Sequence, residues 1–116
     1  MTHYMNLHAC PFAMIASGRK TIELRLYDEK RRQIQIGDTI VFTCDEQSLA
    51  ATVVVLHRFP DFAALYQALP LDRCGYLPEE LATTSPADMD VYYSKEKQAI
   101  YGVLGIEIAL LTEESQ

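Results

Sequence analysis

The chain has 116 residues, of which 49% are hydrophobic and 22% charged, and its formal net charge is −6. The length fits one domain with a single core, and the negative charge argues against non-specific binding to duplex DNA, which depends on neutralising many phosphates. No apolar run approaches the roughly 20 residues of a membrane-spanning helix. Because the start of the sequence also lacks the pattern of a signal peptide, we expect a cytoplasmic protein with no membrane partner.

The first elements in chain order are a strand and a short helix. Residues 4–8 are predicted as a strand, and residues 11–17 as a helix of barely two turns. Pro11 suits the first turn because its missing N–H needs no partner there, and Gly18 supplies a left-handed stop.

Two further strands are predicted at residues 39–44 and 49–57, where apolar and β-branched side chains are frequent. The Gly37-Asp38 pair indicates a tight turn before the first of them. Residues 45–48 form the connecting loop. Consecutive strands joined in this way indicate an antiparallel barrel or meander.

The last third of the chain contains helix starts and a closing strand. Asp61 is a predicted cap for a helix that ends at Pro70. Ser85 and Asp88 have the spacing of a capping box at another helix start. Residues 101–111 form the predicted last strand. We therefore place one domain at residues 1–112 and an acidic tail at 113–116.

Residues 17–32 contain the most informative pattern. A strand is predicted after Gly18, and residues two apart on a strand share a face. One face is then mainly apolar and carries Lys20, Ile22, Leu24 and Leu26, whereas the other carries Thr21, Glu23, Arg25 and Tyr27. Six of the ten Lys and Arg residues lie in this window with three acids, so it carries +3 and the rest of the chain −9. This asymmetry predicts a small positive cleft in an acidic body.

The cysteines and histidines give no sign of a metal site or disulfide framework. The three cysteines contain no CxxC pair. His3 and His8, five apart, would lie on opposite faces of a strand, and His57 is remote in sequence. We expect no metal and no cofactor.

The run formed by Gly18, Lys20, Glu23 and Arg25 matches a Gly-x-Lys-x-x-Glu-x-Arg motif between a short helix and a strand. In this motif and in its order of elements, the chain resembles the ASCH domain family. The resemblance implies an α+β fold, namely a PUA-like small β-barrel with flanking short helices.

The resemblance also implies a function in which RNA or a nucleotide or nucleoside binds in a cleft beside the motif. One branch of the family hydrolyses N(4)-acetylcytidine, and ribonuclease activity is described in another. In the amidohydrolase branch the motif Lys is catalytic, with a Thr three residues later and a distant Glu. Lys20 matches this Lys, but Glu23 stands at the Thr position, so the hydroxyl nucleophile of that branch is absent.

Each candidate residue has a functional and a structural interpretation. Lys20 is either a phosphate contact or a base with a lowered pKa, or else a solvated lysine at a strand end. Glu23 and Arg25 either contact a ligand or simply pair with each other. Tyrosines either stack on an unpaired base or pack in the core. The predicted ligand-binding residues are Lys20, Glu23, Arg25, Tyr27, Tyr92 and Tyr93.

Three functions therefore remain open, and the oligomeric state is left open with them. The first is binding of RNA or a small nucleoside or nucleotide. The second is hydrolysis of a modified nucleoside, with Lys20 and Glu23 as catalytic residues and an acid among Asp72, Glu79 and Glu80. The third is a protein-interaction module whose surface is the charged turn after Tyr27, which contains Lys30, Arg31 and Arg32.

Overall fold

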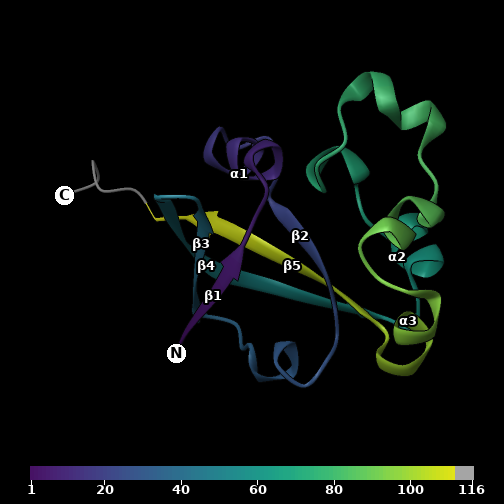
Figure 1. Cartoon of the computed structure of the whole chain (residues 1–116), viewed down its shortest axis with the longest axis horizontal. Helices are drawn as coiled ribbons and strands as arrows, with labels where there is room; N and C mark the ends of the chain where they lie inside the picture. Colours follow the sequence, from purple (N-terminus) through teal and green to yellow (C-terminus); the bar gives the residue numbers. More distant parts are fainter. Residues whose placement is uncertain (112–116) are drawn as a thin grey trace.

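The computed structural model describes residues 1–111, and the predicted acidic tail at 113–116 lies outside them. This part of the chain forms one five-stranded sheet in the order β1-β3-β4-β5-β2 (Figure 1). The strands are β1 (Thr2–Asn6), β2 (Ile22–Leu26), β3 (Thr39–Cys44), β4 (Gln47–Phe59) and β5 (Val103–Leu110).

The sheet is mixed and curls into a half-barrel. β1 pairs parallel with β3, whereas the other neighbouring strands pair antiparallel. β1 and β2 are the two edges, and the Arg25 guanidinium of β2 donates to the Asn6 backbone carbonyl of β1 at 3.2 Å. The edges of the half-barrel are therefore linked at this point. The structure confirms the predicted α+β class with a PUA-like arrangement.

Two groups of short helices cover the sheet (Figure 1). α1 (Ala9–Ala16) connects β1 to β2, and the remaining helices connect β4 to β5, except for η1 (Arg31–Gln33) before β3. The β4–β5 connection contains α2 (Phe62–Ala68), η2 (Leu71–Arg73), η3 (Pro78–Thr83), η4 (Pro86–Val91) and α3 (Lys95–Tyr101). Of these, the η segments are 3-10 helices.

The apolar side chains form two clusters. One lies between α1 and the half-barrel and includes Phe12, Ile15 and Phe42. The other packs the apolar side chains of β2 against α2, η4 and the start of β5. Because burial of such side chains is the main force in folding, the second cluster holds β2 in place through Ile22, Leu24 and Leu26.

Several predicted elements are confirmed. Residues 39–44 form β3, the Asp61 side chain accepts a hydrogen bond from the Ala64 amide, and Ser85 and Asp88 close a capping box. The predicted last strand begins later, at Val103, because α3 occupies residues 95–101. The signals for α3 are the Ser94 side chain, which caps it, and Gly102, whose φ of 73° ends it.

Candidate functional site

β2 carries Glu23 and Arg25 of the motif at one edge of the sheet. Within this strand the alternation of side chains holds: Ile22, Leu24 and Leu26 are buried in the second apolar cluster, while Glu23 and Arg25 point away from it. Since Ile22, Leu24 and Leu26 are at most 7% exposed, the strand is anchored by one face. The opposite face of the strand, which carries Glu23 and Arg25, is held in position by this packing.

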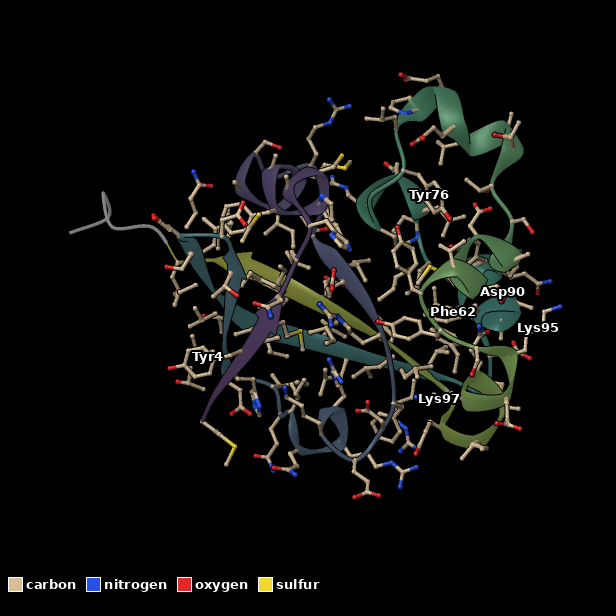
Figure 2. The ribbon with its side chains drawn as sticks, viewed as in Figure 1. Tyr4, Phe62, Tyr76, Asp90, Lys95 and Lys97 are labelled. Carbon is tan, nitrogen blue, oxygen red and sulfur yellow. The ribbon has the colours of Figure 1, made fainter. Side chains whose placement is uncertain are left out.

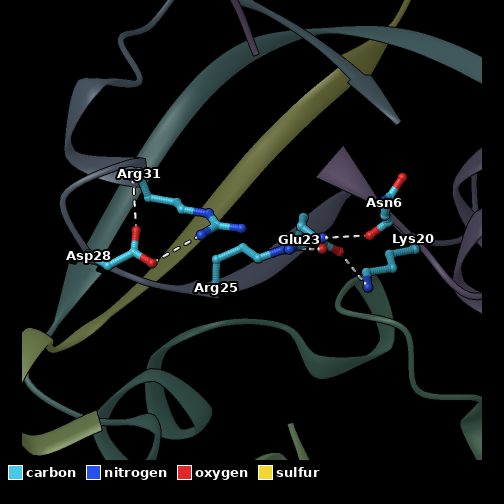
Figure 3. Close-up of polar contacts among 6 residues, drawn as sticks. All are labelled: Asn6, Lys20, Glu23, Arg25, Asp28 and Arg31. Carbon is cyan, nitrogen blue, oxygen red and sulfur yellow. Dashed lines mark hydrogen bonds and ion pairs between the residues drawn. The ribbon is translucent and has the colours of Figure 1, made fainter. Parts of the chain in front are cut away.

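Three charged side chains of the motif form a buried triad (Figure 3). Glu23 Oε1 lies 2.7 Å from Lys20 Nζ, and Glu23 Oε2 accepts a hydrogen bond from Arg25 Nε at 2.7 Å. The side chains of Lys20, Glu23 and Arg25 are 11%, 4% and 14% exposed. One carboxylate between two cations leaves the triad with a net charge of +1.

Lys20 does not lie on the apolar face where strand alternation would place it. β2 begins only at Ile22, so the two-residue period does not extend back to Lys20, and its side chain reaches Glu23 instead. The aliphatic part of Lys20 passes over Gly75: a Cβ at residue 75 would lie 3.3 Å from Lys20 Cδ. With a φ of 111°, Gly75 also occupies a backbone conformation that favours glycine.

A cleft of about 920 Å³ opens beside the triad. Its walls come from the end of β1, the start of α1, β2, the end of β3, and the segment from residue 74 to residue 93. Among the predicted ligand-binding residues, the cleft brings together Lys20, Glu23, Arg25, Tyr92 and Tyr93.

The neighbouring residues Tyr92 and Tyr93 differ in how far their side chains are packed against the protein. The ring of Tyr93 stacks on Phe62, with centroids 6.2 Å apart and planes at 17°, and burial raises the pKa of its hydroxyl although Arg25 opposes this shift. Tyr92 is 63% exposed at the margin of the cleft. Tyr93 is therefore fixed by the second apolar cluster, whereas Tyr92 is open to solvent.

Glu23 remains a carboxylate despite its burial. Desolvation raises its pKa, but the charges and hydrogen bonds of Lys20 and Arg25 outweigh that effect and hold the pKa below its ordinary value of 4.5. The Lys20 ammonium lies 2.7 Å from Oε1, and no other donor among the described residues reaches this oxygen. The triad therefore offers the cleft a charged acceptor atom with unused capacity.

A second hydrogen-bonded set of side chains, formed by Tyr66, Tyr76 and Asp88, lies at the cleft. Tyr76 donates to Asp88 Oδ2 at 2.9 Å and lies 2.6 Å from the Tyr66 hydroxyl. Burial, together with these two contacts, raises the pKa of the Tyr76 hydroxyl. Tyr76 is half-buried, and both Tyr76 and Asp88 line the cleft.

The remaining predicted residues lie outside the walls of this cleft. The guanidinium groups of Arg58 and Arg32 lie over the Tyr27 ring, 4.1 Å and 5.2 Å from its centroid. Arg31 pairs with Asp28 at 3.0 Å (Figure 3). Of the three acids considered for catalysis, Glu80 lines the cleft, and its carboxylate already accepts from the Leu77 amide. Asp72 and Glu79 are not among the lining residues.

Several lining residues were not found from the sequence. A glycine at position 75 is typical of a turn, and Asp88 has the spacing of a capping box after Ser85, but neither pattern indicates a cleft. Tyr76 lies in a segment of short 3-10 turns without strand or helix periodicity, so no pattern gave the direction of its ring. Asn6 contributes through its backbone carbonyl, which no side-chain motif reveals.

Within residues 1–111, no three His, Cys, Asp or Glu side chains are grouped so that they would hold a metal ion. The helices of the same residues are all too short or too polar to cross a membrane.

Three comparisons relate the chain to known proteins. The sequence matches the ASCH domain over residues 5–112, whereas a search of curated proteins found no match. The fold is similar to the crystal structure of hypothetical protein PH0355, with a TM-score of 0.81 and 31% identity over 96% of this chain and 100% of that one. Protein PF0455 from Pyrococcus furiosus gives a TM-score of 0.72 and 33% identity over 96% and 98%.

An ASCH protein from Zymomonas mobilis is similar in fold alone, with a TM-score of 0.60 and 14% identity over 97% of this chain and 74% of that one. The family match covers nearly the whole chain, and the half-barrel sheet agrees with it. The chain belongs to the ASCH domain family.

Proposed function

We propose that the cleft beside the Lys20–Glu23–Arg25 triad binds a nucleoside, either free or as an unpaired residue of RNA. The observation that carries this proposal is Glu23 Oε1, a buried carboxylate oxygen whose one partner among the described residues is the Lys20 ammonium at 2.7 Å. A carboxylate oxygen can accept more than one hydrogen bond, so a ligand that donates to Oε1 uses the capacity that Lys20 leaves free. The N–H groups of a base and the hydroxyls of a ribose are such donors.

The charge and size of the site support the same ligand class. With a net charge of +1, the triad attracts a polar or weakly anionic ligand, but the Glu23 carboxylate repels the oxygens of a polyphosphate. The volume of about 920 Å³ lies within the usual range of small-molecule sites. The net charge of −6 on the chain disfavours extended polyanions, and this restricts RNA to a short unpaired segment.

Hydrolysis of a modified nucleoside is the second candidate, because Lys20 and Glu80 line the same cleft. The geometry favours binding over this reaction for two reasons. Glu23 stands where a hydroxyl nucleophile is expected, and its carboxylate lies 2.7 Å from Lys20 Nζ, so the lysine acts as the cation of an ion pair rather than as a free base.

Calorimetric titration of the purified chain with cytidine, uridine, adenosine and guanosine tests the proposal. The variant Lys20→Met keeps the aliphatic stem on Gly75 but removes the ammonium, and Lys97→Met on α3 is the matched control outside the cleft (Figure 2). We expect Lys20→Met to weaken binding by about 10-fold or more, because the buried Glu23 carboxylate loses one of the two charges that keep it ionised and in place, and Lys97→Met to leave it unchanged.

Two results decide between the functions. If none of the nucleosides and no short single-stranded RNA binds the unmodified chain, the proposal is wrong. Incubation with N(4)-acetylcytidine provides the second arm: release of cytidine by the unmodified chain, lost in Lys20→Met, would assign hydrolysis in place of simple binding.

A further inference from the structure

Tyr76 is a wall residue of the cleft that the motif does not include. It lies in the loop between η2 and η3, on the side of the helical segments that faces β2 (Figure 2). Its hydroxyl donates to Asp88 Oδ2 at 2.9 Å and therefore accepts from the Tyr66 hydroxyl, 2.6 Å away. Both hydrogen-bonding roles of the hydroxyl are thus taken within the protein, and the ring is the part left to contact a ligand.

The partners of Tyr76 are themselves fixed. Tyr66 belongs to α2 and packs edge-on against Phe62, with centroids 6.4 Å apart. Asp88 Oδ2 accepts a hydrogen bond from the Ser85 amide at 3.2 Å in the capping box of η4. The Tyr66 and Tyr76 rings are also nearly perpendicular, at 78°, so Tyr66 does not lie flat on the ring of Tyr76. The ring is consequently held from two elements in one orientation.

The backbone next to Tyr76 joins this wall to the triad. Gly75 lies against the aliphatic part of Lys20, and the Thr21 amide donates to the Arg73 carbonyl at 2.9 Å. Residues 73–75 therefore contact the chain just before β2, at two positions within the motif. Lys20, Glu23 and Tyr76 line the same cleft, so a ligand that contacts Glu23 there is within the space that Tyr76 helps to enclose.

We propose that Tyr76 is the surface on which the flat ring of the bound base stacks, while the polar edge of that base donates to Glu23. This inference rests on the proposed function and narrows the ligand to a planar heteroaromatic ring that carries an N–H donor. Tyr93 is less suited to the role because one face of its ring is already stacked on Phe62. Tyr92, exposed at the margin, lacks the two contacts that orient Tyr76.

The test compares variants that keep or remove the aromatic ring. Stacking of one base on an aromatic side chain corresponds to about 5- to 150-fold in affinity, so Tyr76→Ala and Tyr76→Leu should each weaken nucleoside binding within that range. Tyr76→Phe keeps the ring and should bind within about fivefold of the unmodified chain, since it loses only the orienting contacts. The matched control is Tyr4→Ala, an exposed tyrosine on β1 outside the cleft (Figure 2).

Circular dichroism of each variant shows whether it is folded, and Tyr76→Leu serves if Tyr76→Ala is not. If the unmodified chain binds nucleosides and both ring-deleting variants bind equally well, the stacking inference is overturned while the proposed function stands. If the unmodified chain binds no nucleoside, the proposed function fails and the inference falls with it. Loss in Tyr76→Ala or Tyr76→Leu alongside retention in Tyr76→Phe and Tyr4→Ala supports it.

Discussion

At the scale of single residues, Glu23 is the most constrained side chain of the site. A buried charge is costly unless it is paired and hydrogen-bonded, and Glu23 meets both cations of the motif at 2.7 Å. Desolvation acts to raise its pKa, but Lys20 and Arg25 outweigh it, and the pKa falls below 4.5. The triad is thus a stabilising unit only while the carboxylate is ionised.

The first prediction concerns the pH dependence of Glu23→Gln. Because the folded-state pKa is lowered, the pairing contributes stability above about pH 4.5 and loses it as the pH falls through the folded-state pKa. At pH 7 we expect the variant to lose about 3–5 kcal/mol of unfolding free energy, the usual effect of breaking a buried ion pair. Urea unfolding at pH 7 and pH 3 should show this difference narrowing at the lower pH.

Glu107→Gln is the control for that measurement. Glu107 pairs with His57 at 3.0 Å, but its side chain is 38% exposed, so we expect a loss below about 1 kcal/mol. If the unfolding free energies of Glu23→Gln and the unmodified chain differ by the same amount at both pH values, the loss of stability does not come from the charge of the carboxylate.

Residue-level prediction from the sequence succeeded where a regular strand repeats and failed outside it. Ile22 and Leu24 are buried and Glu23 and Arg25 share the opposite face, as alternation in β2 requires. Lys20 precedes the strand, and its side chain turns to Glu23 for electrostatic reasons that the two-residue period does not contain. The direction of Tyr76 depends on Tyr66 and Asp88, which are distant partners brought together only by the folded chain.

At the scale of elements, the loop around Gly75 sets the position of Lys20. This loop lies between η2 and η3 and meets the start of β2 through the Arg73 carbonyl. Two features favour glycine at position 75: its φ is 111°, and a Cβ there would lie 3.3 Å from Lys20 Cδ.

The second prediction concerns the stability and the nucleoside binding of the variant Gly75→Ala. We expect a loss of about 1–3 kcal/mol in unfolding free energy from the strained backbone, together with weaker nucleoside binding because the added methyl displaces the Lys20 side chain. Thermal unfolding and calorimetric titration measure the two effects separately.

Gly37→Ala is a matched control for this variant. Gly37 has a φ of 95°, but a Cβ there would have no neighbour within 4 Å. We expect a similar loss of stability with unchanged binding. Equal binding by Gly75→Ala and Gly37→Ala would refute the link between the loop and Lys20.

The elements themselves differ in how far the sequence predicted them. β3 and the caps at Asp61 and Ser85 follow from local propensity and turn chemistry, and these predictions are confirmed. α3 was missed although Ser94 and Gly102 bracket it, because its single pair of turns gives little periodicity. The short 3-10 turns between α2 and α3 have no apolar period at all, so their place on the wall of the cleft follows only from tertiary packing.

At the scale of the whole molecule, the site lies where three parts of the fold meet. The edges β1 and β2 are linked by the Arg25–Asn6 hydrogen bond, and the helical segments between β4 and β5 complete the cleft from the other side. Two apolar clusters hold these parts in place. The motif is thus presented by a rigid frame, an arrangement suited to a pre-formed binding site.

Amide shift mapping by NMR shows whether a nucleoside binds between the triad and Tyr76. The ¹⁵N-labelled chain is titrated with each of the four ribonucleosides. We expect the largest shifts at residues 20–25, at Gly75 and Tyr76, and at Tyr92 and Tyr93, with the same shifts weakened in Lys20→Met. Shifts confined to the neighbouring groove between α1 and the β3–β4 turn, at residues 12, 13, 16, 46 and 47 that do not line the cleft, or no shifts with any nucleoside, would contradict this expectation.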